Sequence, residues 1–473
     1  MKKLLALLLI LLSASALAQK PDRSVAPRVQ RPPALRPLHI ERRKLRNGVP
    51  VLVVERHKLP VVSVSLILRA GSAADPPGRH GLANLTAGLL EEGAGTRNAL
   101  EFADELDYLG AALGADVGFD GTEVELYVPV ARLKPALDLM ADMVLRPTFP
   151  EGELERVRKE MLVGFEQLRD DPESIASLAF PRILFGQHRY GTPGFGTAGQ
   201  VSAITRADLV SFHAAHYRPD RAFFVAVGDV RTDEIVALLD EAFGAWGGAA
   251  GPAPEVPDPP QRAGRTVYLV DKPGAAQSEI RIGWVGVPRT TPDYYSIQVM
   301  NTVLGGSFTS RLNQNLREQH GYTYGAGSRF SMRRSSGPFV AYAAVQTDKT
   351  AEAVREFLVE LERIRQPVPE AELTRARNYL AFSYPADFET CQQVSGNLAE
   401  VELYGLPPDT LAAYVDRILA VSADDVARVA RAYVQPDNFA VVVVGDLKAI
   451  RPGLEKLKLG PIQVVPLEDA LGP

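Results

Sequence analysis

The stretch that decides the fold is FFVAVGD at Phe223–Asp229, because a close copy of it, AVVVVGD, returns at Ala440–Asp446. A tyrosine and a Pro-Asp pair precede each copy, at Tyr217–Asp220 and at Tyr433–Asp437. Self-similarity within one chain is the signature of a repeated structural unit. The two segments therefore predict that the chain contains the same fold twice.

Two further pairs of segments have nearly the same spacing. PEGELERVR at Pro150–Arg158 returns as PEAELTRAR at Pro369–Arg377. The offset between paired positions stays between 216 and 219 residues, which indicates a duplication. Predicted helix starts correspond as well, at Thr205 and Asp208 in the first half and at Ser422 and Asp425 in the second.

Length, composition and periodicity agree with two domains that each mix helices and strands. The 473 residues are 46% hydrophobic, which is enough for packed cores. Alternating apolar residues predict a strand with one more polar face at Val62–Leu68, and a second strand at Ile280–Trp284. Leu82, Leu85 and Leu89 recur at helical spacing. We therefore predict an α+β fold of two homologous mixed α/β domains, each a sheet with helices packed on it.

These patterns divide the chain into six segments. We predict a signal peptide at residues 1–18, a Pro- and Arg-rich extension at 19–38 and an N-terminal domain at 39–250. A proline-rich linker at 251–264 joins the N-terminal domain to a C-terminal domain at 265–460. A short tail follows at 461–473.

The first residues have the pattern of a secretory signal. Lys2 and Lys3 precede an apolar run at Leu4–Leu12, and Ala16–Ala18 has the small residues of a cleavage site. The pattern predicts export, to the periplasm or to the outside of the cell. The alternative is an uncleaved membrane anchor, but the run is shorter than the roughly 20 residues that span a bilayer. After cleavage we expect no membrane span.

Charge and cysteine content argue against several classes of protein. The formal charge of −5 becomes −7 without Lys2 and Lys3, so nothing favours nucleic acid as a partner. The sole cysteine, Cys391, lies far from the predicted cleavage site, so it is not a lipoprotein attachment site there. It also has no cysteine in the chain with which to form a disulfide.

The segment GLANLTAGLL at Gly81–Leu90 resembles the metal-binding helix of the pitrilysin/insulinase family of zinc peptidases, the inverzincins. In that family the helix reads approximately Gly-x-Ala-His-x-x-Glu-His. Here Asn84 and Gly88 take the places of the two histidines, and Ala87 takes the place of the glutamate. A carboxamide, a methyl group and a hydrogen cannot hold zinc, so the resemblance implies a chain that binds no metal of its own.

The family's third ligand is a glutamate on a later helix, and its place is also changed. The best match puts Gly164 there, shortly before Asp170–Pro172. A shift in register would instead put Glu160 or Glu166 at that place. The simultaneous loss of all these groups argues against a displaced but working metal site.

The second half keeps a segment that the same family uses in its active site. LGGSFTSRL at Leu304–Leu312 is followed by LREQHGYTY at Leu316–Tyr324, and the resemblance implies that Arg317 and Tyr324 are the family's active-site arginine and tyrosine. A guanidinium and a phenol can both donate hydrogen bonds to the carbonyl oxygen that becomes negative during peptide hydrolysis. The alternative is that Arg317 is a solvated helix residue and Tyr324 a core aromatic.

Two kinds of residue near these motifs have more than one interpretation. Gly305 and Gly306 either form a simple turn or allow a substrate backbone to approach closely. His213 and His216 lie three apart on a predicted helix and could share a metal, but no third ligand is apparent nearby. His80 precedes the altered helix without a following Glu-His pair.

The resemblance runs from about Leu45 to about Leu457 and implies a fold and a function. In the family, two such domains form half of a clamshell, as in mitochondrial processing peptidase, and two halves enclose a peptide chamber. We therefore expect the non-zinc-binding subunit of an exported heterodimeric metalloendopeptidase of the bacterial processing-peptidase-like branch. Its partner would be a paralogue that carries HxxEH and the zinc, and its substrate a peptide or unfolded polypeptide.

Two alternatives remain at the level of the sequence. One is a non-catalytic binding or structural protein with the same fold, like the core subunits of the respiratory cytochrome complex. The retained Arg317 and Tyr324 disfavour this alternative mildly. The other is hydrolysis by this chain alone with an unfamiliar site, for which the sequence offers no residues.

Overall fold

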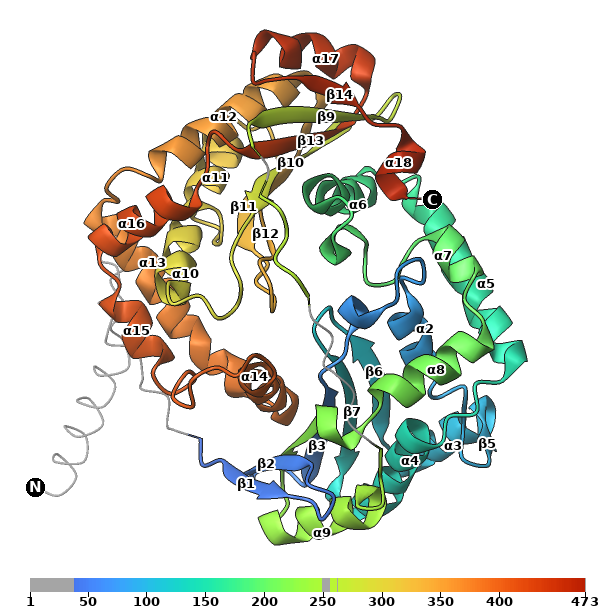
Figure 1. The fold of residues 1–473 in the computed structure, drawn as a ribbon. Coiled ribbons are helices and arrows are strands. Elements are labelled where there is room, and N and C mark those ends of the chain that lie inside the picture. The colour runs from blue at the N-terminus through green and yellow to red at the C-terminus, as the bar shows by residue number, and fades with distance from the viewer. Residues whose placement is uncertain (1–37, 249–255, 262, 473) are drawn as a thin grey trace, which may run out of the picture. The chain divides into compact units, whose positions relative to one another are not determined.

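The computed structural model describes residues 38–248, 256–261 and 263–472. The predicted signal peptide lies outside these residues, as do the predicted extension except for Leu38 and part of the predicted linker. The described chain forms two six-stranded sheets with helices packed on them (Figure 1), which confirms the predicted α+β fold class. In the described residues, no helix combines the length and the apolar character that a membrane span requires.

The two sheets have matching cores, as the duplication predicts. In the first sheet, β8 pairs in parallel with β2 and antiparallel with β3. In the second, β13 pairs in parallel with β9 and antiparallel with β10. The repeated stretches FFVAVGD and AVVVVGD therefore supply equivalent inner strands, β8 and β13.

The strands have the following bounds, in sheet order. The first sheet contains β1 (Glu41–Lys44), β2 (Pro50–Glu55), β8 (Ala222–Gly228), β3 (Val61–Leu68), β7 (Thr122–Pro129) and β6 (Ala112–Val117). The second contains β11 (Ala326–Phe330), β12 (Pro338–Gln346), β10 (Gln277–Val285), β13 (Phe439–Gly445), β9 (Arg265–Asp271) and β14 (Ile462–Val464). A two-residue pair, β4 (Gly93–Ala94) and β5 (Arg97–Asn98), stands apart from both sheets.

The helices of the two halves also correspond at their starts. Capping boxes begin α8 at Thr205 and α16 at Ser422, where Asp208 and Asp425 supply the carboxylates, so both predicted helix starts are confirmed. The first half contains α2 (Leu82–Gly88), α3 (Ala99–Leu109), α4 (Leu133–Leu145), α5 (Glu151–Leu168), α6 (Pro172–Phe185), α7 (Ala198–Ser202), α8 (Arg206–His216) and α9 (Thr232–Phe243). The second contains α10 (Tyr294–Leu304), α11 (Arg311–Asn313), α12 (Thr350–Arg363), α13 (Glu370–Ser383), α14 (Cys391–Tyr404), α15 (Tyr414–Ala420), α16 (Ala423–Tyr433), α17 (Leu447–Lys456) and α18 (Leu467–Leu471).

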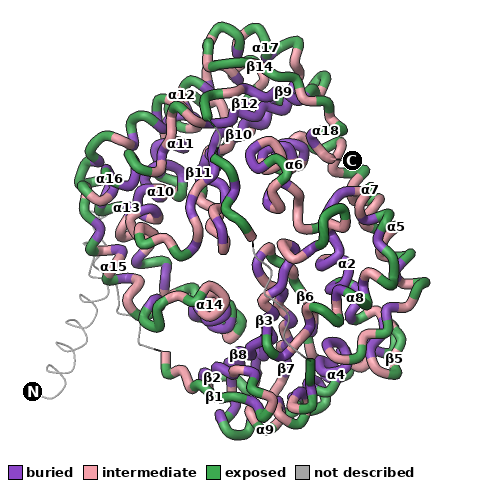
Figure 2. The backbone as a smooth tube through the Cα atoms, viewed as in Figure 1, coloured by how far each residue is buried: buried purple, intermediate pink, exposed green. Residues whose placement is uncertain are grey.

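One helix from each half packs on the sheet of the other half. Helix α6 of the first half packs its apolar residues against β9, β10 and β13 (Figure 1). Helix α14 of the second half packs against β3 and β8. Both sheets are therefore covered on two faces, and their central strands are buried along almost their whole length (Figure 2).

The exchanged helix α14 changes the expected surroundings of the strand at Val62–Leu68. The strand exists as β3, but its more polar face is buried along with its apolar one. Ser395 of α14 donates a hydrogen bond to Ser65 at 2.8 Å, and Ser63 donates one to Glu125 at 2.9 Å. The serines on this face therefore bond to neighbouring side chains and not to solvent.

Candidate functional site

Helix α2 carries the altered metal motif, and the fold holds it in place through a buried carboxylate. Gly81 precedes the helix in the left-handed region, at φ 97°. Because glycine has no side chain, it cannot cap the helix itself. The Asp75 carboxylate instead accepts from the Gly81 and Ala83 amides at 2.8 Å each, and it pairs with Arg189 at 3.1 Å. Burial raises the pKa of Asp75 to about 6, although Arg189 and the two amides oppose the shift.

The apolar side of α2 is a core face, as the spacing of its leucines predicts. Leu82, Leu85 and Leu89 are all buried in the first core. Helix α2 packs against α8 and lies beside α5. The helix therefore has a structural role that does not depend on a metal.

The former ligand positions offer no site for zinc. Asn84 uses its amide nitrogen to donate to the Gly194 carbonyl at 2.9 Å, and Ala87 is buried. Gly88 and Gly164 have open space where a side chain would begin. In the described residues, no three histidine, cysteine, aspartate or glutamate side chains gather as a metal site would require. The donor groups present at this face do not fit zinc.

The register-shifted glutamates on α5 face other partners. Glu160 accepts a hydrogen bond from Arg156 at 2.9 Å, and Glu166 is exposed and lies 3.8 Å from Arg169. Arg156 also pairs with Glu92 just after α2, which ties the two helices together. These contacts give the acidic residues of α5 a structural role.

The histidines on α8 and before α2 are hydrogen-bonded within the fold. His213 donates from Nε2 to the Val144 carbonyl at 2.8 Å, while His216 accepts at Nδ1 from Arg221 at 3.1 Å. His80 accepts from Gln200 at 3.1 Å. Burial lowers the pKa of His80 and of His216 to about 4, and nearby arginines add to both shifts. The structure gives these rings packing and hydrogen-bonding roles.

Arg317 lies on a π-helical segment, Gln314–Gln319, that continues α11. Its guanidinium carbon is 4.6 Å from the centre of the Phe308 ring, and its Nη1 donates to Glu318 at 2.8 Å. The side chain is 34% exposed, so one part of the guanidinium is held while another is accessible. π-Helical turns occur frequently at functional sites.

Tyr324 stands in the segment between this π-helix and β11, and it is 92% exposed. It forms no hydrogen bond or ring contact with another described residue. The aromatic of this segment that does pack against the second core is Tyr322, whose ring stacks on His320. The alternative that Tyr324 is a core aromatic is therefore wrong.

Gly305 and Gly306 end helix α10 against β11. Both amides donate to the Asn301 carbonyl, at 2.8 and 2.7 Å, and the Gly305 carbonyl accepts from the Ser328 amide at 3.1 Å. A Cβ on Gly305 would lie 2.4 Å from the Ser328 nitrogen, so a side chain cannot fit. The glycine is thus required by a close approach within the chain, and contact with a substrate stays a prediction.

Phe308 is the residue of this region that the sequence analysis missed. It is 65% exposed, and its ring supports the Arg317 guanidinium. An aromatic residue directly after Gly305–Ser307 was the available signal, but exposure of a phenylalanine cannot be read from spacing alone. Phe308 and Arg317 are in contact, and we refer to them and the exposed Tyr324 collectively as the aromatic-arginine face.

The comparisons with known proteins place the chain in a family. Residues 51–198 match the insulinase (peptidase family M16) model, and residues 203–380 match the peptidase M16 inactive domain. An uncharacterized zinc protease of Mycobacterium tuberculosis is 30% identical over 379 residues, which are 79% of this chain and 86% of that protein. The duplicated fold is that of a peptidase-type protein. The chain belongs to the insulinase family, peptidase family M16, with a domain of the inactive type.

Solved structures show the same fold over most of the chain. The peptidase M16 inactive domain from Pseudomonas fluorescens has a TM-score of 0.81 and 27% identity, over 86% of this chain and 98% of that one. The periplasmic protease PqqL from Escherichia coli has a TM-score of 0.71 and 15% identity. That alignment covers 92% of this chain but 52% of the longer one. At such identity the second likeness shows the fold alone.

Proposed function

We propose that this chain is the metal-free subunit of a two-subunit exported metalloendopeptidase. In this role it contributes the aromatic-arginine face to a peptide chamber, and a paralogous subunit with an HxxEH motif supplies zinc and a general base. The observation that carries the proposal is that both residues of this motif are accessible: Tyr324 is 92% exposed, and the Arg317 side chain is 34% exposed. A large aromatic that the core does not use is available for a ligand.

The aromatic-arginine face supplies hydrogen-bond donors without a reactive group of its own. The Arg317 guanidinium and the Tyr324 hydroxyl can both donate to carbonyl oxygens of a bound peptide, including the oxygen that gains negative charge during hydrolysis. Stacking on Phe308 holds the guanidinium in one region before the substrate arrives, which reduces the entropy cost of binding. Neither residue can activate water, so bond cleavage requires groups outside this face, and in the proposed role the second subunit supplies them.

Two observations support a second subunit. The altered metal helix retains its packing but lacks ligands at Asn84, Gly88 and Gly164, so the chain has the scaffold without the chemistry. The E. coli periplasmic protease extends well beyond the part that this fold covers, which is 52% of its chain. The rest of that protease's chain is about as long as the matched part, so it is long enough for a second unit of this size. The signal-like pattern at residues 1–18 supports export, and so a partner that is exported too.

Reconstitution tests the proposal directly. The full chain and an HxxEH-bearing paralogue from the same source are assayed separately and mixed, on a library of quenched-fluorescent peptides. We expect cleavage from the mixture only, and a complex of both chains by size-exclusion chromatography. A mixture in which this chain adds nothing would overturn the proposal and favour a non-catalytic binding protein. Cleavage by this chain alone would show that it holds a working site of another kind.

A further inference from the structure

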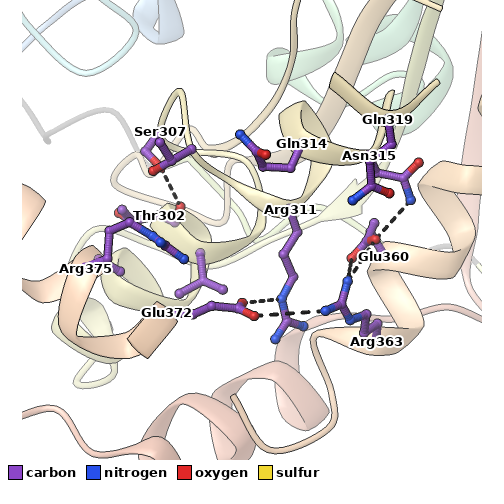
Figure 3. A pocket seen from close by; sticks show the side chains of 13 residues that line it. Thr302, Ser307, Arg311, Gln314, Asn315, Gln319, Glu360, Arg363, Glu372 and Arg375 are labelled. Carbon is purple, nitrogen blue, oxygen red and sulfur yellow. Dashed lines mark hydrogen bonds and ion pairs between the residues drawn. The ribbon is translucent and has the colours of Figure 1, made fainter. Parts of the chain in front are cut away.

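A polar cavity of about 190 Å³ opens beside the π-helical segment, between α10, α11, α12 and α13 (Figure 3). Neither Arg317 nor Tyr324 lines it, so it is separate from the aromatic-arginine face. Three arginines and two glutamates supply all of its ionisable side chains. The cavity therefore has one more positive than negative charge at neutral pH.

The two glutamates are already engaged. Glu372 accepts a hydrogen bond from Arg311 Nε at 2.7 Å, and dashed lines in Figure 3 join it to both Arg311 and Arg363. Glu360 is buried and lies 3.3 Å from Arg363. Arg375 reaches the cavity from α13, and it makes no ion pair or hydrogen bond with another described residue. The positive charge that has no counter-charge is thus carried by Arg375.

Two buried atoms of the lining also lack partners in the described chain. The Arg311 side chain is 6% exposed, and its Nη1 is buried without an acceptor. Asn315 is 6% exposed and turns its amide nitrogen towards Glu356 and Glu360, at 3.3 and 3.0 Å. These carboxylates fix the orientation of the amide, because only nitrogen can donate to them. The Asn315 Oδ1 atom is left buried and without a donor.

The unmatched groups define the chemistry of a ligand. Buried polar groups are normally hydrogen-bonded, so a buried N–H and a buried acceptor without partners destabilise the cavity when it is empty. One excess positive charge suits a monoanion better than a dianion. A carboxylate satisfies the arginines, and an N–H next to it satisfies Asn315 Oδ1.

We propose that this cavity binds a small carboxylate with a neighbouring amide N–H, as in the C-terminal residue of a peptide or in an N-acylated amino acid. Arg311 and Arg375 hold the carboxylate, and Asn315 accepts from the N–H. Glu372 holds the Arg311 guanidinium in place, and Glu360 fixes the orientation of the Asn315 amide. Binding at this site does not depend on peptide cleavage or on a second subunit.

Isothermal titration of the full-length chain with matched probes tests the proposal. N-acetylglycine is compared with N-acetylglycinamide, which has the same size and N–H but no carboxylate. A short peptide with a free C-terminus and its amidated form make a second pair, which separates a peptide source from a free small acid. Inorganic phosphate is titrated as a competing anion.

We expect saturable binding of one or both carboxylate probes and none of the amides. Arg375→Glu should weaken binding about 10-fold or more, since it reverses the charge at an exposed position that the core does not use. The matched control is Arg431→Glu, an exposed helical arginine outside the cavity, which should leave the affinity unchanged. Equal binding of acids and amides, binding of phosphate alone, or an unchanged affinity in Arg375→Glu would each overturn the proposal.

Discussion

The altered metal helix lies in the first half of the duplicated fold and the aromatic-arginine face in the second. The two differ in how far their side chains are buried in the core. On α2 the leucines are buried, Asn84 bonds to Gly194, and Gly88 and Gly164 leave open space. On the second face, Phe308 and Tyr324 are exposed and serve no core. The first face has a scaffold role and offers no ligands at the positions where the resemblance predicts them, while the second presents side chains that the core does not bury.

This contrast shows which features indicate function. A helix in the right place indicates only that the fold persists, because packing alone preserves it. Packing in the core does not account for an exposed phenylalanine and an exposed tyrosine, so these side chains are the better candidates for a function. Substitutions on the first face should change metal binding or stability, whereas substitutions on the second should change turnover.

The largest effect should follow from rebuilding the lost ligands. Asn84→His, Gly88→His and Gly164→Glu together restore two imidazoles four apart and a carboxylate on the neighbouring helix. Because both glycines have open space around them, the new side chains fit without moving the core. We expect zinc binding with a Kd of about 1 μM or tighter, measured by competition with a chromophoric chelator.

The matched control for this rebuilt site carries alanine at the same three positions and should bind no zinc. If the histidine and glutamate variant also binds none, α2 and α5 do not present a former metal site. The interpretation of α2 as an altered metal helix would then be wrong. Circular dichroism of both variants establishes that any difference is not a loss of fold.

The next largest effect concerns the carboxylate that fixes α2. Asp75→Ala leaves Arg189, whose side chain is 10% exposed, without its carboxylate partner, and it removes the side-chain acceptor of the Gly81 and Ala83 amides. Breaking a buried pair in this way should lower the free energy of unfolding by about 3–5 kcal/mol, measured by denaturant titration. Asp233→Ala, at an exposed position in the first turn of α9, should change it by less than about 0.5 kcal/mol. Equal effects would mean that Asp75 is not what holds the helix.

On the second face, Arg317→Ala should affect turnover and not stability. In the reconstituted complex we expect the turnover number to fall about 10²–10³-fold, the usual scale for one donor to an oxyanion. The unfolding free energy should stay within about 0.5 kcal/mol, since the side chain is partly exposed. Arg431→Ala serves as the control for loss of an exposed arginine. Unchanged turnover in an assembled Arg317→Ala complex would refute its role.

Removing the support of Arg317 should have a smaller effect of the same kind. Phe308→Ala removes the ring 4.6 Å from the guanidinium, a contact worth about 0.5–2 kcal/mol. Turnover should therefore fall about 2–30-fold, and Phe308→Tyr should restore most of it. A positioning role also requires that Phe308→Ala adds little in an Arg317→Ala background. Additive losses in the double variant would show that Phe308 acts independently.

Patterns in the sequence predicted the fold class and the motif helices, while contacts between distant elements decided the rest. The helix starts at Thr205 and Ser422 and the leucine face of α2 follow from local spacing, and the structure confirms them. The duplication follows from comparing segments of the chain that lie 216 to 219 residues apart. The burial of Ser65 does not follow from spacing, because it depends on α14, which lies more than 300 residues further along the chain. No local pattern predicts that a helix of each half will pack on the sheet of the other half.

The candidate site was predictable to a similar depth. The resemblance to a family segment picked out Arg317 and Tyr324. It did not show which aromatic of the segment packs against the core, and in the structure that residue is Tyr322 and not Tyr324. Phe308 as a support for Arg317, and Asp75 as a cap for α2, arise from contacts between elements. The polar cavity beside the π-helix combines residues from four helices, so no single stretch reveals it.

The smallest predicted effect is a pH dependence in the first half. His216 has a folded-state pKa of about 4, below its ordinary 6.5, so the unfolded chain takes up a proton between these values and the folded chain does not. The free energy of unfolding therefore rises with pH from about 4 to 6.5 on account of His216. For a fully buried group the change between pH 5 and 7 would be about 2 kcal/mol, and partial exposure reduces it to about 1 kcal/mol.

The measurement compares the natural chain with His216→Gln at both pH values, because other groups also titrate. Asp75 has a raised folded-state pKa of about 6, so the folded chain holds a proton that the unfolded chain has lost, and its contribution falls as pH rises from about 4 to 6. The difference between the two proteins cancels this opposing slope. We expect His216→Gln to lose about 1 kcal/mol less stability between pH 7 and pH 5. An identical loss in both proteins would mean that His216 is accessible to protons when folded, as a metal-binding or surface histidine would be, and not held neutral by its burial beside Arg221.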